Sequence, residues 1–139
     1  MTFPASPFGT EIDATTVVET MQSLKGWEER YRQLIQWGKL LPKMDESFKS
    51  DTVAISGCES QVWLVSKEVD GIWHFHADSD ARIVRGLIAL VLAAYEGKTR
   101  QQISDFDIDD YFAKTGLIAH LSPSRGNGLR AIVETIRQL

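Results

Sequence analysis

The most constraining feature of this sequence is the segment from Ala81 to Glu96, which is apolar on nearly every side of a helix. Its apolar residues are Ile83, Val84, Leu87, Ile88, Leu90, Val91 and Leu92. Ser79 or Asp80 can cap the N-terminal end, and Gly97 follows the C-terminal end. A helix that is apolar all round must be enclosed by other elements, so we expect it to be the central buried helix.

A β-hairpin is predicted just before this helix. Asp70-Gly71 is a two-residue turn signal between two strand-like segments, Gln61–Val69 and Ile72–Asp78. A type I′ turn pairs Val69 with Ile72, and alternation then fixes the two faces of the hairpin. The face expected in the core carries Val62, Leu64, Trp73, Phe75 and Ala77, and the other carries Trp63, Val65, His74 and His76.

Helical patterns flank this centre on both sides. The predicted helices run over Thr10–Leu24, from Trp27 to a boundary at Leu41 before Pro42, over Thr99–Ser104 and Asp109–Thr115, and from Ser122-Pro123 to the C-terminus. A brief β-prone run, Thr52–Ile55, supplies a further strand. The predicted fold is α+β, with helices packed on one face of a short antiparallel sheet of about three strands. Residues 1–139 form a single domain, in which 1–9 is an irregular leader.

Length, charge and cysteine content exclude several classes of function. A formal net charge of −4 disfavours nucleic-acid binding, and no apolar run approaches the roughly 20 residues that span a bilayer. The first residues lack the pattern of a secretory signal, so the cytoplasm is the expected location. The single cysteine rules out an internal disulfide, paired-cysteine zinc and thioredoxin-type cycling.

That cysteine, Cys58, is the main candidate for chemistry. Free cysteine is among the most buried residue types, so a structural thiol is one interpretation. The polar, glycine-containing stretch Ser56-Gly57-Cys58-Glu59-Ser60 is instead typical of a loop that presents a reactive group, and these residues alone leave both open. One thiol suffices to attack a sulfur–sulfur bond in a partner, because the partner supplies the other sulfur.

Other chemical groups give weaker hypotheses. His74, His76 and Asp78 alternate on one strand, which fits a metal site or simply an exposed polar strand face. Cys58 with His120 and an acidic residue fits a cysteine hydrolase, although no hydrolase motif accompanies them. Trp63 and Val65 suit either a docking surface or packing beneath a loop. The acidic stretch at residues 105–110 is most simply a solvated turn.

Several separated motifs resemble one family in the same order. They are Ile55-Ser56-Gly57-Cys58-Glu59-Ser60-Gln61-Val62-Trp63, Asp78-Ser79-Asp80, Ile83-Val84-Arg85-Gly86-Leu87, Leu121-Ser122-Pro123-Ser124-Arg125 and Gly128-Leu129. From Trp27 onward the chain resembles the SufE family, the sulfur acceptors that activate cysteine desulfurases. Residues 7–10 lean towards the branch that serves a second desulfurase, whereas Phe106–Arg125 looks as much like the branch tied to a dedicated cluster-assembly system.

The resemblance implies the fold of the NifU/IscU iron–sulfur scaffolds and assigns roles to two residues. Cys58 corresponds to the acceptor that receives persulfide sulfur from a desulfurase of the SufS or CsdA type. Arg125 corresponds to an arginine near that cysteine and is a candidate stabiliser of thiolate or persulfide, although a solvated helix arginine is the simpler interpretation. The sulfur would pass to a downstream acceptor or an iron–sulfur scaffold. Pyridoxal phosphate belongs to the desulfurase, so no cofactor and no metal are expected here. The alternatives are a non-catalytic desulfurase regulator and the cysteine hydrolase.

Overall fold

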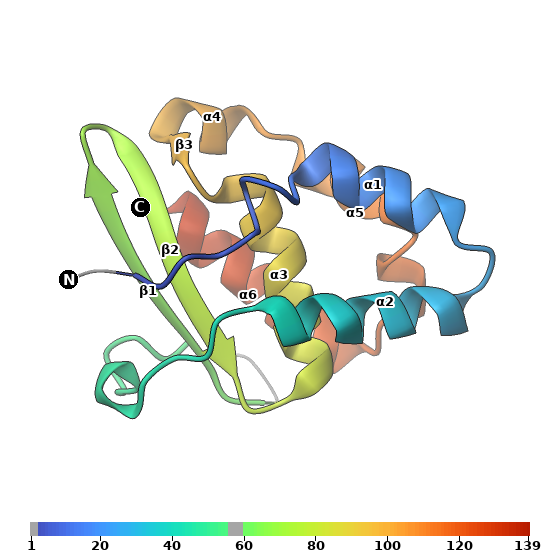
Figure 1. Ribbon diagram of the computed structural model, residues 1–139, viewed down its shortest axis with the longest axis horizontal. Helices are drawn as coiled ribbons and strands as arrows, with labels where there is room; N and C mark the ends of the chain where they lie inside the picture. The colour runs from blue at the N-terminus through green and yellow to red at the C-terminus, as the bar shows by residue number, and fades with distance from the viewer. Residues whose placement is uncertain (1–2, 56–59) are drawn as a thin grey trace.

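The computed structural model describes residues 3–55 and 60–139 (Figure 1). The α-helices are α1 (Ala14–Ser23), α2 (Trp27–Leu40), α3 (Arg82–Tyr95), α4 (Arg100–Asp105), α5 (Ile108–Thr115) and α6 (Pro123–Arg137). The strands are β1 (Val62–Val69), β2 (Ile72–Ser79) and β3 (Lys98–Thr99), and two 3₁₀ turns are η1 (Glu46–Phe48) and η2 (Ile118–His120). The described chain is therefore α+β, with the helices gathered on one side of a β1–β2–β3 antiparallel sheet.

The predicted hairpin is confirmed in its register and in its core face. Val69 pairs with Ile72 across the turn, where both Asp70 and Gly71 have positive φ. Positive φ at both central residues is what a type I′ turn requires. The face expected in the core does face it, because Leu64 and Phe75 are buried there and Trp73 packs against them.

The third strand differs from the expectation. Lys98–Thr99 pairs with the start of β2, whereas the run Thr52–Ile55 makes only an isolated bridge between Ala54 and Trp63. Two residues carry too little sequence pattern to be read as a strand. The pairing follows from the sharp reversal at Gly97, which brings the chain back to the hairpin after α3.

The second face of the hairpin is covered around Val65 and His76, so the alternative of an exposed polar face is wrong for His76, whereas Val69 near the turn is exposed. Val65 and His76 are buried, and the His76 ring lies 5.7 Å from the ring of Phe3 and 6.1 Å from that of Phe48. Trp63 lies beneath the ammonium of Lys49 at 4.7 Å and therefore packs under the neighbouring segment. Desolvation in this layer lowers the pKa of His76, and the nearby Asp78 carboxylate only partly opposes the shift.

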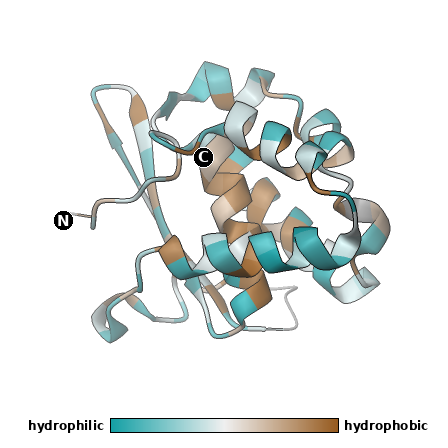
Figure 2. Cartoon of the chain, turned by 45° about the vertical axis from the view of Figure 1, so that its right-hand side comes forward, coloured by the Kyte–Doolittle hydropathy of each residue, from teal (hydrophilic) through white to brown (hydrophobic). Residues whose placement is uncertain are grey.

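Helix α3 is the buried centre of the fold, as expected, and Figure 2 shows its hydrophobic ribbon running through the middle of the molecule. Helix α2 crosses it at very short range. A Cβ atom on Gly86 would lie 2.3 Å from the carbonyl oxygen of Leu34, and one on Gly38 would lie 2.9 Å from the Gly86 nitrogen. Only glycine permits this approach, which fixes α3 against α2.

The starts of α1 and α3 differ from the predictions, and those of α4 and α5 are each shifted by one residue. Helix α1 begins at Ala14 rather than near Thr10, because Asp13 accepts a hydrogen bond from the Thr16 N–H at 2.9 Å and so acts as the cap. Helix α3 begins at Arg82, and Ala81 occupies its N-cap position without making a side-chain hydrogen bond to the helix. The predicted cap signals of α5 and α6 hold: Gly116 ends α5 in the left-handed region, and Ser122 caps α6.

Candidate functional site

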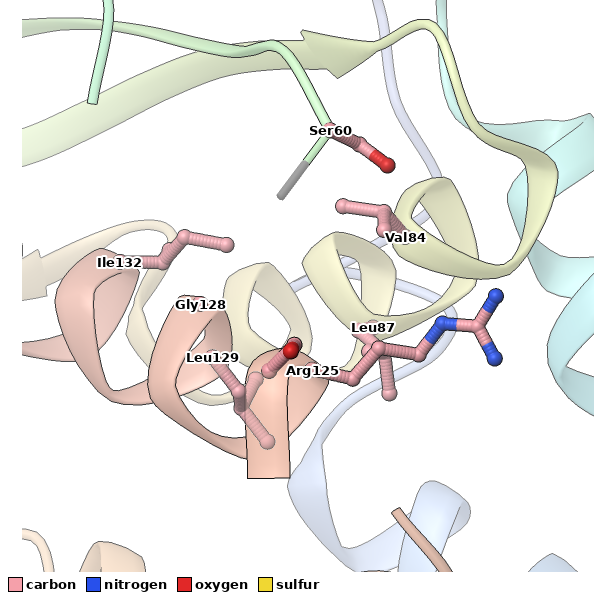
Figure 3. Close-up of a pocket in the computed structure, with 8 residues that line it drawn as sticks. Ser60, Val84, Leu87, Arg125, Gly128, Leu129 and Ile132 are labelled. Carbon is pink, nitrogen blue, oxygen red and sulfur yellow. The ribbon is translucent and has the colours of Figure 1, made fainter. Parts of the chain in front are cut away.

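Four of the five family-like motifs meet in one small pocket, about 20 Å³ in volume (Figure 3). Its lining residues are Ser60, Val84, Leu87, Ser124, Arg125, Gly128, Leu129 and Ile132. All of these except Ile132 fall within the motifs quoted above, although the motifs lie far apart along the chain. The fold thus brings residues of four sequence motifs, between positions 60 and 129, to one place.

The two ends of the cysteine-bearing segment are held by main-chain pairing. The Ile55 N–H donates to the Val62 carbonyl at 2.9 Å, so the residues on either side of positions 56–61 are tied together. On the far side, the Gln61 N–H donates to Asp80 Oδ1 at 3.1 Å, and Ser79 Oγ donates to the Gln61 carbonyl at 2.6 Å. Ser79 and Asp80, expected to cap α3, thus bond the residue next to Ser60.

Cys58 itself, with Ser56, Gly57 and Glu59, lies outside the described residues. The first described residue after it is Ser60, whose hydroxyl points into the space between β1 and α3 in Figure 3. Only the residues that flank positions 56–59 are described, and the assignment of Cys58 therefore stays a prediction.

Arg125 lies in the first turn of α6, where it lines the same pocket as Ser60. Its backbone N–H donates to the Ser122 hydroxyl at 3.3 Å, so the cap fixes the start of the helix. Its exposed side chain forms no ion pair with any residue in 3–55 or 60–139. The N-terminal half-charge of α6 and an uncompensated guanidinium both favour a negative group at this pocket.

The histidine candidates lie elsewhere and are used within the protein. His74 Nδ1 lies 2.7 Å from Glu96 Oε2, and Asp78 forms a buried ion pair with Arg85. Asp78 also accepts from the Met44 N–H at 2.9 Å, so its carboxylate is occupied. Among the described residues no group of three or more histidine, cysteine or carboxylate side chains is arranged to hold a metal ion.

Two further features are His120 and the apolar wall of the pocket. The ring of His120 stacks on that of Trp27 at 4.6 Å, and nothing in the described part of the chain joins it to an acidic residue as a hydrolase triad requires. The wall residues Val84, Leu87 and Ile132 were not predicted as site residues. The sequence signal that could have found Val84 and Leu87 is their place in the motif Ile83-Val84-Arg85-Gly86-Leu87, whereas Ile132 lies in none of the quoted motifs.

Comparison with known proteins identifies the family. The SufE family, described as an Fe-S metabolism associated domain, matches residues 15–139. The chain belongs to the SufE family. It is 44% identical to the sulfur acceptor protein CsdE of Escherichia coli over 135 residues, which cover 96% of this chain and 92% of that protein. It is also 43% identical to an uncharacterised SufE-like protein of Rhizobium meliloti, over 87% of this chain and 89% of that one.

A solved structure supports the fold. The solution structure of a hypothetical protein from Thermus thermophilus superposes with a TM-score of 0.72 at 16% identity, covering 90% of each chain. The SufE-like fold expected from the motifs is thereby confirmed. No helix among residues 3–55 and 60–139 is long and apolar enough to cross a membrane.

Proposed function

We propose that this SufE-family protein is a sulfur acceptor that takes persulfide sulfur from a cysteine desulfurase onto Cys58. The observation that carries the proposal is the pocket in which Ser60, two positions after Cys58 in the cysteine motif, meets the N-terminal turn of α6. The likeness to a sulfur acceptor protein over 96% of the chain supports the same role. The protein acts in the cytoplasm as a carrier that stimulates its donor, and not as a stand-alone enzyme.

The proposed step is an exchange at sulfur. The Cys58 thiolate attacks the outer sulfur of the donor's cysteine persulfide, a sulfur–sulfur bond forms to Cys58, and the donor's sulfur–sulfur bond breaks. The electron pair of the broken bond leaves on the donor's cysteine as thiolate, so no outside oxidant or reductant is needed. Only the thiolate is a competent nucleophile, and an unperturbed cysteine is only slightly ionised near neutral pH.

Arg125 and the start of α6 are proposed to favour the anionic forms. A guanidinium and a helix N-terminus at the Ser60 pocket both favour an anion there, which suits thiolate before the attack and persulfide after it. Pyridoxal phosphate serves the desulfurase, and no cofactor is assigned to this chain. The carried sulfur then passes to iron–sulfur cluster assembly or to another sulfur-using pathway.

The test is intact-protein mass spectrometry after incubation with a desulfurase and free cysteine. Wild-type protein is expected to gain one sulfur atom that a reductant removes, and Cys58→Ser is expected to gain none. The matched assay is desulfurase turnover, which wild type should stimulate and Cys58→Ser should not. Equal stimulation by Cys58→Ser, with no sulfur gained by wild type, would show a non-catalytic regulator instead.

A further inference from the structure

A second groove lies between α1 and α5, on a part of the surface that shares no residue with the Ser60 pocket. Its volume is about 310 Å³. In Figure 1 the two helices run side by side at the upper right, away from the start of β1. The acidic stretch at residues 105–110 borders this groove, and the proposed sulfur transfer gives it no role.

The floor of the groove is apolar. Val18 and Phe106 are half-buried in it, and the Phe106 ring meets that of Tyr111 edge-on at 5.4 Å. The Tyr111 hydroxyl donates to the Leu90 carbonyl at 2.8 Å, inside the core. Tyr111 therefore offers the groove only its ring, and the floor is suited to an apolar side chain.

The rim of the groove carries more negative than positive charge. Glu19, Asp107 and Asp110 line it, against the single cation Lys114. Lys114 is already paired with Asp110 at 2.9 Å, and Asp107 uses its carboxylate to cap α5 at the Asp110 N–H. Glu19 is exposed and has no ion pair with any residue of the described chain. Lys114 is thus the one lining cation for three lining carboxylates, and its ion pair is with Asp110.

We propose that this groove is a docking site for a basic amphipathic segment of a protein partner. An apolar centre ringed by charge is the anatomy of a protein interface, and an amphipathic helix laid in a groove is a common way to fill one. The partner's apolar side chain would cover Phe106 and Tyr111, while its lysines or arginines face Glu19 and Asp107. The negative rim disfavours nucleic acid and anionic lipid.

This inference is independent of the sulfur chemistry. A segment bound between α1 and α5 would leave the Ser60 pocket open, because the two sites share no lining residue. The surface therefore suits a protein that recruits the carrier or receives it after loading.

The probe is a synthetic amphipathic peptide of about four helical turns, with leucine on one face and lysine on the other. Binding to the full-length protein is measured by fluorescence anisotropy and mapped by amide chemical shifts. We expect saturable, salt-sensitive binding, with shifts concentrated in residues 14–22 and 105–114. A peptide with glutamate in place of lysine should not bind.

Three variants separate this site from general attraction. Glu19→Lys should weaken binding about tenfold, because it replaces an attraction by a repulsion on an exposed helix face. Asp107→Asn should weaken it about threefold while keeping the cap, since asparagine caps helices as well as aspartate. Glu68→Lys, on the distant hairpin, makes the same charge change as Glu19→Lys and should leave binding within twofold of wild type.

Several results would overturn the proposal. These are no saturable binding below about 1 mM, equal loss with Glu68→Lys and Glu19→Lys, or shifts centred outside α1 and α5. Self-association of the protein that Glu19→Lys abolishes would also overturn it, because a second copy would then be the occupant. Thermal melts of each variant establish that the fold is intact before binding is compared.

Discussion

Gly86→Ala tests the packing that holds α3, and with it Val84 and Leu87, at the Ser60 pocket. The added Cβ would lie 2.3 Å from the carbonyl oxygen of Leu34 and 2.8 Å from the carbonyl carbon. Both atoms belong to the main chain of α2, which has no rotamer that relieves the clash. The two helices must therefore separate along their contact.

The expected cost follows from two opposing effects. Overpacking a core costs about 1–3 kcal/mol, and a main-chain clash belongs at the upper end of that range. Replacing a helical glycine by alanine returns about 0.5–1 kcal/mol, because the unfolded chain loses conformational freedom. We expect a net loss of about 2 kcal/mol in the free energy of unfolding, or a fall in melting temperature of about 5–10 °C.

The measurement is urea denaturation followed by tryptophan fluorescence, with the slope of the transition checked for two-state behaviour. Gly126→Ala is the matched control. Gly126 also lies in a helix, yet a Cβ there meets no described atom within 4 Å, so this variant should gain about 0.5–1 kcal/mol. If Gly86→Ala were as stable as wild type or more so, the close approach of α2 and α3 would be refuted.

Two further predictions concern His76 and Arg125. Because burial lowers the pKa of His76, the unfolded chain takes up a proton at a higher pH than the folded protein does. The free energy of unfolding should therefore have its full value above about pH 6.5 and fall as the pH drops towards the lower pKa of the folded state. In urea unfolding at pH 7.5 and pH 5.5, His76→Phe should lose less stability on acidification than wild type, and an equal loss would contradict the burial argument. Arg125→Ala should slow sulfur transfer about tenfold with an unchanged melting temperature, because it removes a cation from the surroundings of the anion. The control is Arg130→Ala, which changes an exposed arginine on the same helix. Equal single-turnover rates for the two variants would remove Arg125 from the mechanism.

Local sequence patterns settled the elements whose causes lie within a few residues. The Asp70-Gly71 turn set the register of the whole hairpin, since alternation carries one pairing along both strands. Ser122 and Gly116 marked a helix start and a helix end, because caps act on neighbouring amides and carbonyls. The apolar circumference of residues 81–96 likewise required that helix to be central.

Only the tertiary structure decided features that depend on residues far apart in the chain. Strand β3 exists because the reversal at Gly97 returns two residues to β2, and two residues show no alternation of their own. Asp80 has the chemistry of a helix cap, yet its carboxylate accepts a hydrogen bond from the N–H of Gln61, which lies 19 positions earlier in the chain. His76 looked exposed by alternation, and it is buried because the leader and the η1 segment cover that face.

The candidate site was likewise determined partly by the sequence and partly by the tertiary structure. The sequence by itself determined which residue types are present, including a single thiol and an arginine beside a helix start, and its motifs identified the SufE family. The meeting of Ser60, Val84 and Arg125 in one pocket was decided by how α3 and α6 pack behind the hairpin. Covalent neighbours determine local conformation, but burial and long-range contact depend on what the rest of the folded chain brings to the same place.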